Sequence, residues 1–256
     1  MDPPGGQMGG AERARMVEAQ APRAEEAEAY YAKLIAEEAA TGEPELLLLA
    51  ELCAGGTAVD VGANRGVYAF ALAARAREVH AFEANPDYAE FARRMLGPRA
   101  RVHEVALSNA RGRAPFFVPI ADDGGELHLA GNLTNAHPQF ARQRVVDARL
   151  ETLDAYALTG VSFIKVDVEG SELEVLEGAA ATIARDRPVL LLELLSGIYP
   201  DPLATALEVC EAYGYSAFVV HEGRRLDAAA VIKALNANST WGSAVATRNV
   251  VFLARP

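Results

Sequence analysis

From Gly56 onward, short apolar runs of strand length alternate with longer segments of helical periodicity. This alternation is typical of a parallel sheet whose strands are connected by crossover helices. The chain has 256 residues, of which 51% are hydrophobic, and this length suits one large α/β domain better than two. We predict a doubly wound sheet with strands at Ala58–Val61, Glu78–Phe82, Val102–Ala106, Ser162–Val166 and Val189–Leu192. Helices are expected at Val67–Arg75, Asp87–Leu96, Ser171–Ala184 and Pro202–Tyr213.

The two ends of the chain differ from this pattern. Residues 1–22 mix proline, glycine and charge without apolar periodicity, and we expect a flexible tail. Residues 23–55 include a stretch rich in alanine and glutamate that predicts a helix, more often a solvated cover for one edge of the domain than an element that closes over substrate. The main domain is expected to span residues 56–256 and to finish with an antiparallel hairpin made from Ser216–His221 and Asn249–Ala254.

One internal segment, residues 112–146, interrupts the alternation. Glycine, proline and asparagine recur in it, and no long helical period is present. Long irregular segments inside compact domains are often lids or substrate loops. We therefore expect this insertion to contact the substrate.

Charge and cysteine content narrow the classes of function. The formal net charge of −11, with an isoelectric point near 5.0, argues against nonspecific nucleic-acid binding. The two cysteines, Cys53 and Cys210, have no metal-like spacing, and no apolar run approaches the length of a membrane span. A cytoplasmic protein without a membrane span, acting on a small molecule and not on nucleic acid, is the expectation.

A glycine turn follows the first predicted strand, in the sequence AVDVGANRGVYAF. A dinucleotide fingerprint would need glycine at positions 62, 64 and 67, but Asn64 and Val67 occupy the last two. No Gly-Lys-Ser/Thr tripeptide follows Gly62, so a phosphate-binding Walker loop is excluded as well. What remains is a turn with Asp60 before it and Gly62 and Gly66 within it.

The acidic residue before this turn favours a cationic ligand. Asp60 would repel a pyrophosphate but attract an ammonium or a sulfonium, and S-adenosylmethionine carries both. Glu83, at the end of the second strand, is placed to accept hydrogen bonds from the two ribose hydroxyls. Ala106 and Ser108, after the third strand, would lie beside the adenine.

The fourth strand ends in FIKVDVEGSELEVLEG, which places Lys165, Asp167 and Glu169 at alternate positions. Alternate residues of a strand share a face, and burying three charges together is costly unless they pair with each other, a ligand or a metal. We expect Asp167 to face the methyl donor. The alternatives are a structural Lys–Asp pair and a helix cap formed by Glu169 and Gly170 near Ser171.

These segments together resemble the FkbM-type S-adenosylmethionine-dependent methyltransferases. The similarity extends from about Gly56 to Leu194, and FEANP stands where this family more often has FEPNP. The resemblance implies a class I methyltransferase fold, Rossmann-like, and O-methylation of a hydroxyl on a small-molecule acceptor such as a sugar or natural product. The matching residues are VDVGANRGVY at Val59–Tyr68, FEANPD at Phe82–Asp87, VALSNARG at Val105–Gly112, ETLD at Glu151–Asp154, IKVDVEGSELEVLEGA at Ile164–Ala179 and LLLE ending at Glu193.

Site roles follow from the resemblance and the motifs together. The cofactor ligands are expected to be Asp60, Gly62, Asn64, Gly66, Glu83, Ala106, Ser108 and Asp167, and the catalytic candidates are Asp167, Glu169 and His137. His137 and His128 lie in the insertion, where a histidine is more often a surface residue than a base. Some O-methyltransferases of this kind hold a divalent ion, and the carboxylates suited to Mg²⁺ here are those of Asp167, Glu169 and Glu193.

Two rival functions stay open. A protein or nucleic-acid methyltransferase would share the cofactor, but base-amino methyltransferases commonly carry an Asn/Asp-Pro-Pro-aromatic motif where this chain has DVEG. A non-catalytic protein that binds S-adenosylmethionine would share the fold. Cofactor binding and methyl turnover separate these alternatives.

Overall fold

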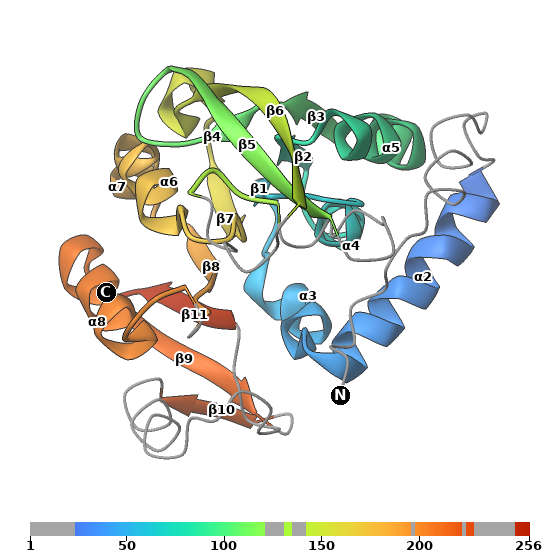
Figure 1. Cartoon of the computed structure of the whole chain (residues 1–256). Coiled ribbons are helices and arrows are strands. Elements are labelled where there is room, and N and C mark those ends of the chain that lie inside the picture. The colour runs from blue at the N-terminus through green and yellow to red at the C-terminus, as the bar shows by residue number, and fades with distance from the viewer. Residues whose placement is uncertain (1–23, 121–130, 135–141, 196–197, 222–223, 228–248) are drawn as a thin grey trace.

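The computed structural model describes residues 24–120, 131–134, 142–195, 198–221, 224–227 and 249–256 (Figure 1). Within these residues a central sheet has eight strands in the order β10-β9-β11-β8-β7-β1-β2-β3. Its strands are β1 (Thr57–Val61), β2 (Glu78–Glu83), β3 (Arg101–Glu104), β7 (Val161–Val166), β8 (Val189–Glu193), β9 (Tyr215–His221), β10 (Arg224–Asp227) and β11 (Asn249–Ala254).

The sheet is parallel from β3 to β8 and reverses its strand order at β1. Strands β2 and β3 extend it on one side, and β7 and β8 extend it on the other. The carboxyl ends of β1 and β7 therefore meet at a switch point, where open α/β sheets bind their ligands. The predicted doubly wound α/β fold is confirmed.

The end of the chain is antiparallel, as expected, but it is more than a hairpin. Strand β11 lies between β8 and β9 and pairs antiparallel with both. Strand β10 pairs with the outer side of β9 and forms an edge of the sheet.

The helices agree with the prediction except at one position. Helices α4 (Val67–Ala73), α5 (Pro86–Leu96) and α8 (Pro202–Tyr213) lie close to their expected bounds. The single helix expected over Ser171–Ala184 is wrong, because the chain forms α6 (Glu172–Glu177) and α7 (Ala180–Asp186). A Cβ at Gly178, between them, would lie 2.0 Å from the carbonyl oxygen of Ser108, so the close backbone approach occurs where the helix is interrupted.

The third strand is also shorter than predicted. Strand β3 ends at Glu104, and Ala106–Leu107 forms β4, which leaves the central sheet. Strand β4 joins a second sheet of order β4-β6-β5, built with β5 (Gly112–Ile120) and β6 (Arg142–Glu151). The backbone turns at Val105, whose N–H donates to the Glu83 carbonyl at 3.1 Å.

Residues 112–146, expected to be irregular, thus contain most of a long antiparallel hairpin, and the expectation is wrong for its two strands. The nine residue pairs of β5 and β6 run in continuous register from Gly112↔Leu150 to Ile120↔Arg142. Pro115 and Pro119 lie in β5, an edge strand, where a residue without an N–H is tolerated. Because of these prolines, the sequence did not indicate a strand here.

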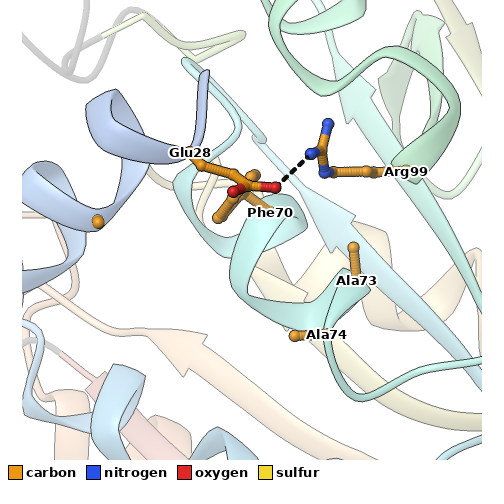
Figure 2. A pocket seen from close by; sticks show the side chains of 6 residues that line it. Glu28, Phe70, Ala73, Ala74 and Arg99 are labelled. Atoms are coloured by element: carbon orange, nitrogen blue, oxygen red, sulfur yellow. Dashed lines mark hydrogen bonds and ion pairs between the residues drawn. The ribbon is translucent and has the colours of Figure 1, made fainter. Parts of the chain in front are cut away.

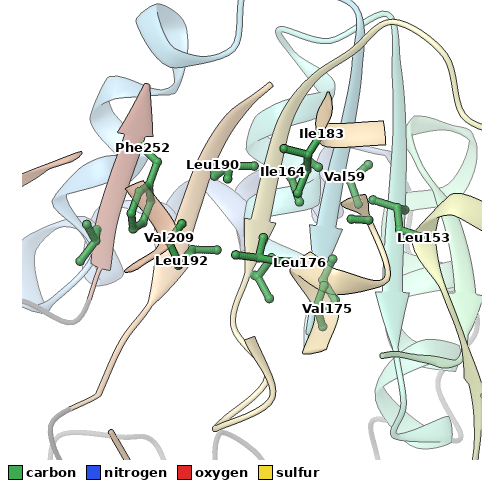
Figure 3. Packing of buried hydrophobic residues seen from close by; sticks show 14 of the residues in the cluster. Val59, Leu153, Ile164, Val175, Leu176, Ile183, Leu190, Leu192, Val209 and Phe252 are labelled. Carbon is green, nitrogen blue, oxygen red and sulfur yellow. The ribbon is translucent and has the colours of Figure 1, made fainter. Parts of the chain in front are cut away.

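The apolar core occupies both faces of the central sheet. Figure 3 shows one face, where Val59, Ile164 and Leu190 of the strands pack with Val175 and Ile183 of helices α6 and α7. The opposite face packs against α4 and the N-terminal segment, which consists of α2 (Ala24–Thr41), the 3-10 helix η1 (Pro44–Leu48) and α3 (Leu49–Leu52). None of the helices in the described part of the chain has the length and apolar character that a membrane span requires.

Candidate functional site at the carboxyl edge of the sheet

The glycine turn follows β1 in a left-handed backbone conformation. Gly62, Asn64 and Gly66 have φ angles of 76°, 50° and 84°. The N–H groups of Gly62 and Ala63 donate to the Phe82 carbonyl at 2.9 and 3.0 Å. A Cβ at Gly62 would lie only 1.7 Å from the carbonyl oxygen of Asp167, so glycine is required where the loops after β1 and β7 touch.

Glu83 connects this turn to the start of α5. Its two carboxylate oxygens accept hydrogen bonds from the N–H groups of Asn64 and Asn85, each at 2.7 Å. The residue is 6% exposed, and burial raises its pKa to about 7 against the lowering effect of these two donors. A carboxylate offers about four lone-pair sites, so Glu83 keeps capacity for the two hydroxyls of a ribose.

Asp60 is the buried acid beneath the turn. It is 1% exposed, and neither of its oxygens accepts a hydrogen bond of good geometry from any described residue. Burial raises its pKa to about 6, while the Lys165 ammonium and the nearby N–H of Ala69 oppose the shift. A buried carboxylate without hydrogen bonds costs free energy that a bound cation would offset.

Lys165 lies opposite Asp60 in the β1–β7 register. Its side chain is 4% exposed, and Nζ lies 2.9 Å from Asp167 Oδ2 and 4.6 Å from the centroid of the Tyr68 ring. Burial lowers the pKa of Lys165, but Asp167 and Asp60 outweigh this and hold the pKa above its ordinary value. The Lys–Asp pair that sequence reasoning left open is therefore present, and the predicted site residue Asp167 takes part in it.

Asp167 of this pair also lies close to two further carboxylates. Asp167, Glu169 and Glu193 place one oxygen each within 4.8 Å of one another, although they come from the ends of two strands. Glu169 has a left-handed φ of 56°, directly before Gly170. The three carboxylates predicted to bind Mg²⁺ therefore lie together. The Lys165 ammonium balances part of their negative charge. Binding of Mg²⁺ itself stays a prediction.

Glu172 holds the loop that carries Asp167 and Glu169, and sequence reasoning missed this role. Its carboxylate accepts from the N–H groups of Val168 at 2.9 Å and Gly170 at 3.1 Å, and from the hydroxyl of Tyr199. Burial raises its pKa to about 7. The available signal was an acid in the first turn of a helix, a position that commonly serves the helix terminus alone.

The N-terminal segment supplies a second group that the sequence did not reveal. Glu43 Oε2 accepts from the Tyr68 hydroxyl at 2.7 Å and from Asn249 Nδ2 at 2.5 Å. Glu45, 2% exposed, accepts from the same Asn249 amide at 3.2 Å, and burial raises its pKa to about 7. The two contacts to Asn249 connect residues more than 200 positions apart. Asn249 pairs with Glu193 of β8, so these contacts lie at the same end of the sheet as Glu193.

The other predicted residues have different outcomes. Ala106 lies buried in β4, and the N–H of the following Ser108 donates to the Glu151 carbonyl at 2.9 Å. Both are therefore fixed by the second sheet, and their contact with adenine stays a prediction. His137 and His128 lie outside the described residues.

A cavity of about 420 Å³ lies elsewhere, between α2 and α4 (Figure 2). Its wall is mainly apolar, and Glu28 and Arg99 form an ion pair of 2.9 Å across it. Helix α4 begins at the carboxyl edge of the sheet, so its last residue, Ala73, and the following Ala74 place this cavity toward the amino edge. It is separate from the glycine turn and the carboxylates.

These features define a class of protein. A doubly wound sheet with a glycine turn after its first strand and an acid at the end of its second strand is the architecture of an α/β nucleoside-binding domain. Residues 60–217 match the family model described as Methyltransferase FkbM domain, and the chain belongs to this family. The match confirms the resemblance read from the sequence.

A curated relative is also similar. The 2-O-methyltransferase NoeI from Sinorhizobium fredii (strain NBRC 101917 / NGR234) is 28% identical over 144 residues, covering 50% of this chain and 59% of that protein. The chain therefore spans less than two thirds of that relative.

Two solved structures share lower identity with this chain. One is methyltransferase FkbM from Methylobacillus flagellatus KT, with 16% identity, a TM-score of 0.48 and coverage of 77% of this chain and 43% of that chain. The other is an O-methyltransferase from Bacillus cereus in complex with SAH, with 13% identity, a TM-score of 0.43 and coverage of 96% and 97%.

Proposed function

We propose that this protein transfers a methyl group from S-adenosylmethionine to a hydroxyl of a small molecule, such as a sugar or another natural product. The observation that carries the proposal is the pair of buried acids at the ends of β1 and β2. Asp60 has no hydrogen bond of good geometry within the described residues, and Glu83 accepts one N–H from the glycine turn and one from the start of α5. One acid suits a cation and the other a ribose.

The residues around the turn bind and orient the donor. Bound S-adenosylmethionine supplies a methyl group activated by its positive sulfur. Asp60 favours the cationic part of the ligand, Gly62 and Gly66 let the backbone approach it, and Glu83 holds the ribose. Because methyl transfer needs oxygen, carbon and sulfur in line, this fixed geometry contributes through alignment.

The acceptor is proposed to lie over the ends of β7 and β8. The acceptor oxygen forms the new bond to the methyl carbon as the carbon–sulfur bond breaks, and the hydroxyl proton passes to a base. Among the described residues, the candidates for this base are the carboxylates of Asp167 and Glu169. His137 remains a candidate from the sequence. Carboxylates also accept hydrogen bonds from hydroxyls, which suits a sugar-like acceptor. The name of the relative NoeI, a 2-O-methyltransferase, supports oxygen as the acceptor atom.

We further place the protein in the cytoplasm and expect no nucleic-acid partner. Cys53 and Cys210 are both free and buried, which suits a reducing compartment. The net charge of −11 disfavours a phosphate backbone as partner.

Calorimetry and turnover test the proposal in sequence. The folded protein is titrated with S-adenosylmethionine and with S-adenosylhomocysteine, and binding of both is expected. It is then incubated with the donor and a panel of hydroxylated sugars and natural products, with a protein and an RNA as comparison acceptors. Methylation of a hydroxyl supports the proposal. Binding of neither ligand overturns it, and methylation of only protein or RNA replaces it with the rival class.

A further inference from the structure

We propose that Tyr31 of the N-terminal helix α2 is a positioning residue of the cofactor site, because its hydroxyl holds the glycine turn at the Arg65 carbonyl. The inference rests on the proposed function in one respect, since its ligand is S-adenosylmethionine. The matched family region begins at residue 60, so Tyr31 and all of α2 lie outside it.

The contact is a single hydrogen bond from a fully buried side chain. The Tyr31 hydroxyl donates to the Arg65 carbonyl at 2.7 Å, and the side chain is 0% exposed. The ring stacks on Phe70 of α4, with centroids 4.4 Å apart and planes at 19°. A Cβ at Gly66 would lie 3.2 Å from the same hydroxyl, so tyrosine and glycine fit closely together.

This hydrogen bond completes the fixation of one peptide unit. The Arg65 carbonyl belongs to the same unit as the Gly66 N–H, which donates to the Ala63 carbonyl at 2.7 Å. Both polar ends of the unit are therefore occupied. The Gly66 carbonyl, in the next peptide unit, accepts from the Phe70 N–H at 2.9 Å, so the unit that Tyr31 holds directly precedes the first turn of α4.

The turn needs such support because its backbone is unusual. Asn64 and Gly66, on either side of Arg65, both have positive φ angles. Glu83 holds the Ala63–Asn64 peptide unit through the Asn64 N–H, and Tyr31 holds the Arg65–Gly66 unit through the Arg65 carbonyl. Strained segments persist when the surrounding structure determines them from several sides.

Helix α2 makes a second, weaker contact with the turn. Glu38 Oε1 lies 3.4 Å from a guanidinium nitrogen of Arg65, and both side chains are partly exposed. Because the ammonium, sulfonium and ribose of the ligand are held by groups around this turn, loosening residues 64–66 should weaken donor binding. Turnover of the bound donor should change little, since Tyr31 does not contact the carboxylates near β7.

The test compares Tyr31→Phe with a matched control, Tyr215→Phe. Tyr215 is also 0% exposed, and its hydroxyl also donates to a backbone carbonyl, that of Pro188, at 2.8 Å. Each variant removes one hydrogen bond from a buried tyrosine hydroxyl to a backbone carbonyl, so similar losses in melting temperature are expected. Only Tyr31→Phe is expected to raise the dissociation constant of S-adenosylmethionine, by about tenfold, with kcat nearly unchanged. Equal affinities in both variants would overturn the inference.

Hydrogen exchange of residues 62–67 gives a readout that needs no ligand. Faster exchange of the Gly66 N–H is expected in Tyr31→Phe and not in Tyr215→Phe. If the wild-type protein bound no S-adenosylmethionine, the proposed function would fail, while unchanged exchange in Tyr31→Phe would separately refute the role of Tyr31. Glu38→Gln, which weakens the partly exposed contact to Arg65, should raise the dissociation constant by about twofold.

Discussion

The acidic side chains of the two halves of the carboxyl edge have different partners. At the ends of β1 and β2, Glu83 is surrounded by backbone N–H donors that the turn and the start of α5 supply. At the ends of β7 and β8, Asp167, Glu169 and Glu193 face one another, and a side chain, Lys165, balances part of their charge. The first half presents a rigid backbone, whereas the second presents side chains.

This difference suits the two proposed ligands. Backbone donors around a turn cannot move without changing the fold, so they suit a cofactor of constant structure. Carboxylates held by another side chain can change partners when an acceptor or a cation binds. Variants that affect one half and not the other therefore test whether the first half binds the cofactor and the second binds the acceptor or a cation.

The largest effect is expected where the two halves touch, at Gly62. Gly62→Ala places a methyl group 1.7 Å from the Asp167 carbonyl oxygen and forces alanine to a φ of 76°. The free energy of unfolding should fall by about 3 kcal/mol, from backbone strain and steric overlap together. Chemical denaturation measures this loss.

The control is Gly55→Ala, where φ is also positive at 85° but no atom lies within 4 Å of the new Cβ. A loss of about 1 kcal/mol is expected there from strain alone. Equal losses in the two variants would show that the contact between the halves is unimportant.

The next effect isolates the cofactor half. Glu83→Gln removes the charge and turns an amide NH₂ toward one of the two N–H groups that the carboxylate accepts from. The dissociation constant of S-adenosylmethionine should rise by about thirtyfold, the equivalent of about 2 kcal/mol for hydrogen bonds to a charged group. Calorimetry measures it, with Glu104→Gln as control because Glu104 ends the adjacent strand β3 and is half exposed. Unchanged affinity would mean that the ribose does not bind at Glu83.

Asp60→Asn should separate binding from stability. Removing a buried charge whose oxygens accept no hydrogen bond of good geometry from the described residues is expected to raise the free energy of unfolding by about 1 kcal/mol. The same change should raise the dissociation constant of S-adenosylmethionine by about tenfold, because the cation loses its counter-charge. Thermal unfolding and calorimetry on one preparation test the expected gain in stability and the expected loss of affinity. A destabilised variant with full affinity would contradict the role given to Asp60.

The acceptor half is tested by Glu193→Gln and by removal of divalent cations. Glu193→Gln should lower kcat by about fivefold and leave donor affinity unchanged, because Glu193 belongs to the carboxylate cluster and not to the turn. If the cluster holds Mg²⁺, EDTA should lower turnover in the same way, and added Mg²⁺ should restore it. Full turnover in EDTA would show that turnover needs no divalent cation at these carboxylates. A change in donor affinity in Glu193→Gln would contradict the distinction between the two halves.

The smallest effect is a pH dependence. Burial raises the pKa of Asp60 to about 6 and that of Glu83 to about 7, both above their ordinary values. The folded protein therefore binds more protons than the unfolded chain between about pH 4 and 7, and its stability should decrease as the pH rises through this window. Affinity for the cationic donor should instead rise, by about threefold from pH 6 to 7.5, as both acids ionise. Parallel titrations at several pH values check these opposite trends, and an affinity that falls with pH would contradict them.

The local motifs could be read from the sequence because neighbouring residues determine them. Asp60, Gly62 and Gly66 belong to one short turn, and helix Pro202–Tyr213 was predicted to its exact bounds. Strands β5 and β6 could not be recognised, because Pro115 and Pro119 are tolerated only through the edge position of β5, which is a property of the sheet. The split of the expected helix at Gly178 depends on Ser108, 70 positions away.

The alternating α/β order, the glycine turn and the two acids at the ends of β1 and β2 could be read from the sequence alone, because hydrophobic period and turn chemistry act over a few residues. The packing of distant segments decides which other groups meet at this edge. It brings Asn249 to Glu43 and the Tyr31 hydroxyl to the Arg65 carbonyl. Such contacts depend on strand order and on how α2 packs against α4, and no local pattern along the chain encodes them.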